Sequence, residues 1–114
     1  MPVEIHLFQV EGERYMQITI PESGGLEYNL VQRPIGKILT PDGQLDPRLN
    51  DRIQYYNQRT RYRGNRNEFV GGTLGTIDQY LHDNPTAPEG EVQALHAIRR
   101  AIITPELNEI NHQQ

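Results

Sequence analysis

The sequence predicts an α+β protein in which an N-terminal hairpin and a third strand form a small antiparallel sheet, with two to three C-terminal helices packed on one face. Two observations support this class. Apolar and polar residues alternate up to about residue 39, and apolar residues recur at helical spacing after residue 46. At 114 residues the chain has the length of one domain, so we expect a single domain over residues 1–114.

The strands are expected within residues 3–39. Alternation over residues 3–10 and 14–20, separated by the turn dipeptide Glu11-Gly12, predicts the hairpin. A further alternating run over residues 26–30 predicts the third strand. The apolar pair at residues 38–39 suggests a short additional edge strand.

The first helix is expected at residues 47–63. Asp46 is a favourable N-cap, and Pro47 suits the first helical position because its missing N–H has no partner there. Gly64 is a suitable residue to end the helix. This helix carries the most unusual group of side chains in the chain.

Two further helices are expected, at residues 74–83 and 88–103. The glycine-rich segment 71–75 predicts a connector in front of the second helix. Thr104-Pro105 predicts the end of the third helix, because proline disrupts a helix interior. The polar segment that follows is expected to fray.

Six of the eleven basic residues lie within residues 48–66, where Asp51 is the one acid, so this stretch carries a net charge of +5 and the rest of the chain −9. On a helix turning by about 100° per residue, five of its side chains fall within about 80° of arc. We call these five residues the arginine–tyrosine strip: Arg48, Arg52, Tyr55, Arg59 and Tyr62. Arg66 would extend the strip if the helix continued beyond Gly64.

Three interpretations of the strip compete. It can be a solvated face neutralised by acids of the same chain, a protein-binding surface, or a nucleic-acid-binding surface. Arginine and tyrosine are enriched at the centres of protein interfaces. The net charge of −4 opposes nucleic-acid binding, because it weakens long-range attraction to phosphates.

We therefore predict a non-enzymatic module that docks the strip, with Tyr55 and Arg59 as anchors, on an acidic protein surface or on a second copy of the chain. A hydrophobic content of 35% is low for a self-sufficient core, which favours a homo-oligomer. The alternative is binding of RNA or single-stranded DNA by the same strip.

Arg99 is a separate candidate for partner binding. It falls within the apolar arc of the third helix, near Val92, Leu95 and Ile102. Because an unpaired charge is costly to bury, Arg99 is expected either to be paired within the chain or to face a partner.

No combination of residues predicts catalysis, a metal or a cofactor. The chain has no cysteine, which excludes thiolate chemistry and cysteine-based metal sites. The segment 71–76 lacks the lysine of a phosphate-binding loop, and the single serine, Ser23, lies in a turn without a recognisable partner. The histidines show no metal-binding spacing; they are His6, His82, His96 and His112. Two pairs of nearby carboxylates are interpreted as turn or helix-start residues: Glu11 with Glu13, and Glu89 with Glu91.

We expect a cytoplasmic protein. No apolar run approaches the roughly 18 residues needed to cross a membrane. The first ten residues show no basic start followed by an apolar run, so no secretory signal is expected.

Overall fold

The computed structural model describes residues 2–112, and the side chains of residues 2–105. Three strands, β1 (Glu4–Val10), β2 (Glu13–Pro21) and β3 (Glu27–Pro34), form an antiparallel sheet in the order β1-β2-β3. Ile5 pairs with Ile18, and Ile18 pairs with Val31. The predicted hairpin and third strand are confirmed.

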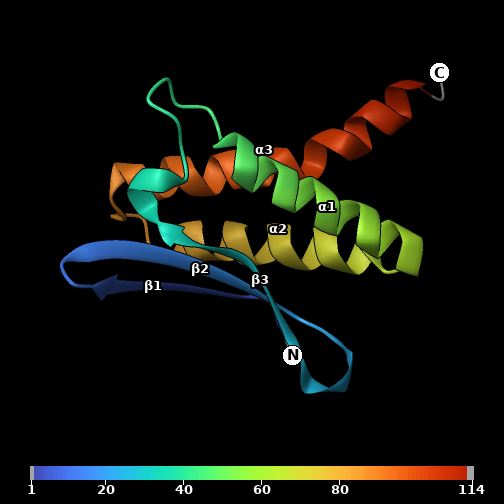
Figure 1. Ribbon diagram of the computed structural model, residues 1–114, viewed down its shortest axis with the longest axis horizontal. Coiled ribbons are helices and arrows are strands. Elements are labelled where there is room, and N and C mark those ends of the chain that lie inside the picture. Colours follow the sequence, from blue (N-terminus) through green and yellow to red (C-terminus); the bar gives the residue numbers. More distant parts are fainter. Residues whose placement is uncertain (1, 113–114) are drawn as a thin grey trace.

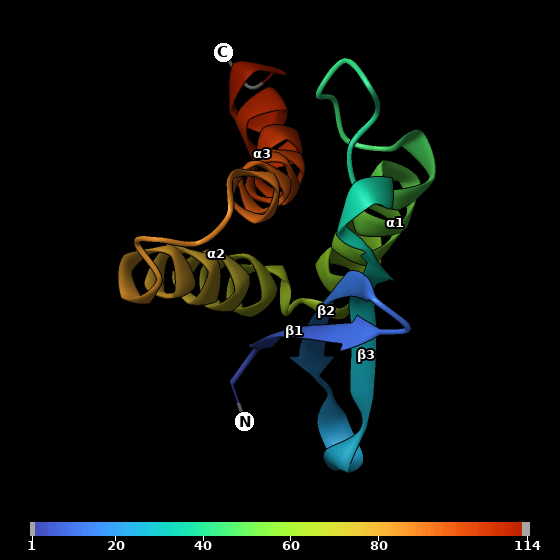
Figure 2. The same ribbon diagram turned by 90° about the vertical axis from the view of Figure 1, so that its left-hand side faces the viewer.

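Three helices cover one face of this sheet: α1 (Pro47–Arg63), α2 (Arg66–Asp83) and α3 (Glu89–His112) (Figures 1 and 2). α1 contacts β3, α2 contacts β1, and α3 packs on α1 and α2. One buried cluster joins these layers through residues such as Met16, Leu49, Ile77 and Ile98. The predicted α+β class is confirmed. No helix in the described part of the chain combines the length and apolar character needed to cross a membrane.

The bounds of α1 agree with the prediction, because both ends carry specific chemistry. Oδ1 of Asp46 accepts hydrogen bonds from the backbone N–H groups of Arg48 and Leu49, at 3.0 and 3.3 Å. The same oxygen accepts a hydrogen bond from Arg33, at 3.0 Å, and this bond is the main cause of the lowered pKa of Asp46. Gly64 ends the helix in the left-handed conformation, at φ 82°.

The predicted connector at residues 71–75 is wrong, because α2 runs through it without interruption. The helix is stabilised by packing rather than by intrinsic preference: Phe69, Thr73 and Ile77 are buried along one side. Near the start of β1, a Cβ added to Gly72 would lie 3.7 Å from Cγ2 of Val3. The glycines therefore form part of a helix and not a flexible loop.

The predicted end of the third helix is also wrong, because α3 continues through Pro105 to His112. The predicted frayed segment is helical as far as His112. Proline has no N–H to donate to the carbonyl of Ala101, four residues earlier. The side chain of Gln54, from α1, donates to that carbonyl instead, at 2.8 Å. Figure 1 shows the C-terminal part of α3 turned away from the axis of its first part.

The additional edge strand predicted at residues 38–39 does not form. β3 ends at Pro34, which cannot extend a ladder of backbone hydrogen bonds, and a 3₁₀ turn at Ile35–Lys37 follows. The carbonyl of Ile38 accepts a hydrogen bond from the N–H of Asp46, at 2.9 Å, and Leu39 forms a single bridge with Leu45. This segment therefore anchors the start of α1.

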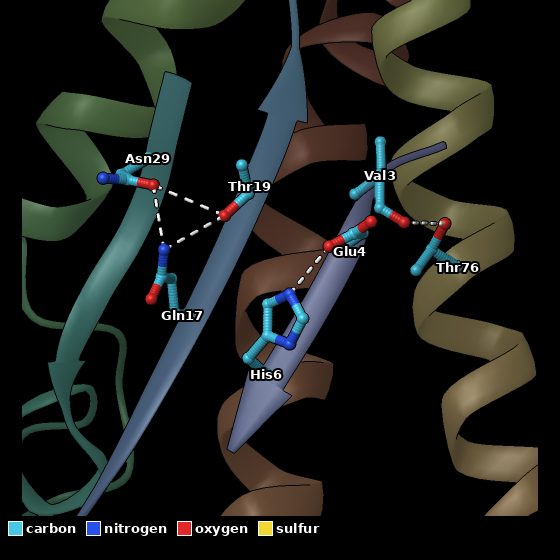
Figure 3. Close-up of polar contacts among 7 residues, drawn as sticks. All are labelled: Val3, Glu4, His6, Gln17, Thr19, Asn29 and Thr76. Atoms are coloured by element: carbon cyan, nitrogen blue, oxygen red, sulfur yellow. Dashed lines mark hydrogen bonds and ion pairs between the residues drawn. The ribbon is translucent and has the colours of Figure 1, made fainter. Parts of the chain in front are cut away.

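The sheet face without helices carries a polar network (Figure 3). Nε2 of Gln17 donates to Oγ1 of Thr19 at 3.2 Å and to Oδ1 of Asn29 at 3.1 Å. The hydroxyl of Thr19 donates to the same oxygen of Asn29 at 3.3 Å. On β1, His6 pairs with Glu4 at 2.8 Å. Strand alternation thus puts apolar side chains under the helices and polar ones on the open face.

Candidate functional site

The arginine–tyrosine strip lies on the surface of a single continuous helix, as predicted. Tyr55 and Tyr62 are 64% and 93% exposed. The neighbouring apolar side of α1 is buried through Leu49, Ile53 and Tyr56. Because the strip borders this buried side, its side chains can reach the adjacent strand β3.

Arg52 connects the strip to β3. Its Nη2 and Nε donate to the backbone carbonyl of Asn29, at 2.6 and 3.2 Å. Its guanidinium carbon lies 4.9 Å from the centre of the Tyr28 ring, and that of Arg59 lies 5.9 Å from the same centre. Cation–π attraction therefore helps to hold two strip arginines over one aromatic ring. The side chain of Asn29 takes part in the polar network of the open sheet face (Figure 3).

Glu22, which follows β2, is a carboxylate that lies beside the C-terminal half of α1, next to Arg59 of the strip. Its Oε2 accepts a hydrogen bond from the hydroxyl of Tyr56 at 3.2 Å and from Nη1 of Arg63 at 3.3 Å. Its Oε1 lies 3.8 Å from Nη2 of Arg59. The Glu22 side chain is 17% exposed. Burial, followed by the charge and hydrogen bond of Glu22, raises the pKa of Tyr56 to about 12.

A cavity of about 690 Å³ opens beside Glu22, between the β2–β3 connection, the end of α1 and the start of α2. Its lining combines both signs of charge with apolar surface and includes Glu22, Ser23, Leu26, Arg59, Arg63 and Glu68. Leu26 is 67% exposed. The cavity can therefore admit a side chain from another molecule next to the arginines.

Arg66 does not extend the strip, because α1 does not continue beyond Gly64. The left-handed turn at Gly64 separates α1 from α2, and Arg66 is the first residue of α2. Its residue surface is only 9% exposed. It is a largely buried residue of α2 and does not belong to the exposed face.

Arg99 also lies apart from the strip. Its Nε and Nη2 donate to the two carboxylate oxygens of Asp78 on α2, at 3.0 and 3.4 Å. The structure thus brings together Arg48, Arg52, Tyr55, Arg59 and Tyr62, and separates Arg66 and Arg99 from them. Arg99 was expected either to pair within the chain or to face a partner, and its contact with Asp78 is a pairing within the chain.

Sequence reasoning missed Glu22, Tyr28 and Asn29. These residues lie more than twenty positions before their arginine partners, so periodicity within the helix gives no sign of them. Alternation places Tyr28 on a strand but cannot identify the side chain opposite its ring. Glu22 follows a strand and would be expected to point into solvent.

The other candidate sites do not come together. Within the described residues, no cluster of histidine, aspartate and glutamate could hold a metal ion. His82 pairs with its neighbour Asp83 at 3.3 Å, and the side chain of His112 lies outside the described part. Glu91 lies in the first turn of α3, as expected, but it is not a surface residue. It is buried and accepts a hydrogen bond from Arg14 at 2.8 Å.

The glycine-rich segment 71–75 lies inside α2, so its backbone N–H groups are not presented to a phosphate. Geometry thus leaves the strip and its cavity as the candidate site. None of the known protein families, curated proteins or solved structures compared with the chain matches it.

Proposed function

We propose that this chain is a non-enzymatic protein-binding module that docks the arginine–tyrosine strip on an acidic surface of another protein. One observation carries the proposal. Within the described residues, the large apolar or aromatic side chains that remain exposed are Val10, Leu26, Tyr55 and Tyr62. Two of them belong to the strip and Leu26 lines the adjoining cavity, so exposed contact area gathers beside the arginines.

The charge of the strip supports an acidic partner. Arg52 binds a carbonyl oxygen, and Arg59 lies 3.8 Å from Glu22. Arg48 makes no ion pair with any residue that the structure describes. An internally neutralised face would place carboxylates beside most of its arginines, whereas Glu22, beside Arg59, is the one carboxylate that pairs with the strip among the described residues. An acidic surface would supply the missing charges and guide association.

A second copy of the chain is a less direct partner. In a two-fold dimer built through the strip, the arginines of both copies would face each other and repel. A second copy would have to present an acidic region elsewhere on its surface. RNA or single-stranded DNA is a rival ligand for the same strip. We also propose a cytoplasmic location, with which the lack of cysteine agrees.

The test uses Tyr55→Ala and Arg59→Ala, with Arg100→Ala as the control because Arg100 is an exposed arginine on α3. Fluorescence anisotropy with a labelled peptide of alternating glutamate and leucine measures binding. Loss of an anchor costs about 2 kcal/mol, which is roughly a 30-fold loss of affinity. We expect such losses for the two strip variants and little change for the control.

A single-stranded RNA oligonucleotide is titrated in parallel at two salt concentrations. Unchanged peptide affinity in both strip variants would show that the strip is not the docking surface. Tighter binding of the oligonucleotide than of the peptide, lost steeply with salt and lost in the same variants, would establish the nucleic-acid function instead.

A further inference from the structure

One arginine of the strip, Arg59, already faces a carboxylate of the same chain, that of Glu22. Three groups surround Glu22: the hydroxyl of Tyr56 at 3.2 Å and the guanidinium groups of Arg63 at 3.3 Å and Arg59 at 3.8 Å. We call these three groups the carboxylate cradle. They come from successive turns on one side of α1, so the helix presents them together.

The fit between Glu22 and the cradle is loose. Charge-assisted N–H···O contacts of the strongest kind span about 2.7–2.9 Å. Both arginine contacts of Glu22 are longer, and neither guanidinium forms a pair of hydrogen bonds with this carboxylate. A carboxylate that approached from the open side could form shorter bonds with the same donors.

Glu22 can leave the cradle without rearrangement of the fold. Its backbone N–H donates to the carbonyl of Leu26 at 2.8 Å, which anchors the main chain. Rotation of the side chain alone frees Tyr56, Arg59 and Arg63, and such rotations are fast on the scale of protein binding. The released carboxylate can be hydrated, because the adjoining cavity of about 690 Å³ opens to solvent.

The cavity also indicates what enters. It brings the cradle next to the exposed side chain of Leu26. A ligand that places an acidic side chain beside an apolar one would satisfy the arginines and cover Leu26 in the same step. A protein segment with this pattern fits better than a phosphate, which offers no apolar group.

We propose that Glu22 occupies the carboxylate cradle in the free protein and that an acidic side chain of the partner, next to an apolar one, replaces it on binding. This proposal rests on the proposed function and adds its regulation. Glu22 acts as an internal competitor, so acidic surfaces that cannot reach the cradle bind weakly.

The test compares Glu22→Gln with Glu68→Gln in binding of the same glutamate–leucine peptide. Glu68 lines the same cavity, and its replacement removes the same charge, but among the described residues the hydrogen bonds and ion pairs of the cradle are made with Glu22 and not with Glu68. If Glu22 fills the cradle about 90% of the time, its removal raises affinity about tenfold. The Glu68→Gln variant should change affinity by less than about twofold, which is the general electrostatic effect of one charge.

Equal gains in both variants would overturn the proposal, because charge alone would explain them. A weaker-binding Glu22→Gln variant would overturn it as well, since Glu22 would then be organising the site. Failure of the wild type and of every variant to bind the peptide would instead count against the proposed function. If the wild type binds the peptide and Glu22→Gln binds it equally well, the proposed function is supported and the role of Glu22 as a competitor is contradicted.

A direct measurement of displacement completes the test. In protein labelled with ¹³C-glutamate, the side-chain carboxyl resonance of Glu22 is assigned by its absence in Glu22→Gln. Saturation with peptide should shift this resonance to the position of a solvated glutamate while the resonance of Glu68 moves less. A Glu22 resonance that stays in place in the saturated complex would contradict displacement.

Discussion

Tyr56 connects the candidate site with the hydrophobic core at the scale of a single residue. Its ring stacks on Tyr28, with centres 4.3 Å apart, and meets the edge of Phe69 at 4.9 Å. Its hydroxyl reaches the carboxylate of Glu22. The side chain of Tyr56 thus contacts both the buried aromatic rings and the carboxylate of Glu22. Its ionisation therefore depends on the packing of the core and on the charge of the site.

The raised pKa of Tyr56 predicts a loss of stability in alkaline solution. The unfolded chain releases the phenolic proton near pH 10, whereas the folded protein retains it to about pH 12. Stability from this difference is fully present below pH 10 and is lost as the pH rises to 12, by roughly 2–3 kcal/mol in total. Urea unfolding across this range measures the effect.

The variant Tyr56→Phe keeps the ring and removes the ionisation, so its stability should fall less steeply between pH 10 and 12. The pKa of Tyr80 is also raised by burial, but that residue is present in both proteins and cancels in the comparison. The same pH dependence in wild type and variant would mean that the Tyr56 hydroxyl is not buried against Glu22.

The members of the strip could be predicted from the sequence, because side chains three and four positions apart on a helix share a face. The sequence also predicted that Arg99 would need a counterion or a partner. It could not identify Glu22 or Tyr28, because these residues reach the strip only after β2 and β3 have packed against α1. Contacts between distant segments have no local signature.

Helix α1 was predictable as an element because its ends are specified by Asp46, Pro47 and Gly64. Helix α2 was predicted in its C-terminal part, at residues 74–83, and missed in its first part, because glycines have the local preference of a loop and the helical state of this part depends on packing. The same holds for Pro105, which normally ends a helix but is accommodated here by Gln54 of another element. Local sequence therefore located the termini of α1 and failed where tertiary contacts override preference.

Replacing glycine by alanine should have opposite effects in these two helices. Gly71 and Gly75 are helical, exposed and without a neighbour within 4 Å of an added Cβ. Alanine at either position should stabilise the protein by roughly 0.5–1 kcal/mol by restricting the unfolded chain. Gly64→Ala should destabilise it by roughly 1–2 kcal/mol, because Gly64 has φ 82°.

Chemical denaturation of the three variants provides the measurement. Stabilisation by Gly71→Ala and Gly75→Ala depends on an uninterrupted α2. No gain at either position would indicate that the segment is a flexible connector, since alanine would then restrict the folded and the unfolded chain alike.

The proline within α3, Pro105, predicts an energetic coupling between α1 and α3. Gln54→Met should destabilise the protein by roughly 1–3 kcal/mol, because the carbonyl of Ala101 loses its donor. In a Pro105→Ala background the new N–H can bond to Ala101, so the same Gln54 substitution should cost less. A double-mutant cycle measured by urea unfolding isolates this difference, expected at about 1 kcal/mol. Additive effects would contradict the role assigned to Gln54.

At the scale of the whole molecule, positive charge is concentrated in one stretch of the chain, most of which forms helix α1. The stretch that contains the strip carries +5 and the rest of the chain −9. Such an arrangement attracts acidic partners to one side and allows the acidic remainder of a second copy to approach the same side. Because the strip cannot pair with itself, association between copies would run from strip to acidic surface.

This geometry predicts how the purified chain associates with itself. Contacts between unlike surfaces continue from copy to copy unless they close into a ring, so we expect assemblies that grow with concentration and do not stop at a dimer. Sedimentation velocity at about 0.01 M and about 1 M salt, where charges are screened beyond about 30 and 3 Å, tests this. Association should occur at low salt, disappear at high salt, and weaken in Arg48→Ala more than in Arg100→Ala.

A species of the 13.2 kDa chain mass at both salt concentrations would leave another protein as the partner of the strip. A dimer indifferent to salt would show that copies meet through an apolar surface elsewhere, because contacts made by arginines must weaken as their charges are screened.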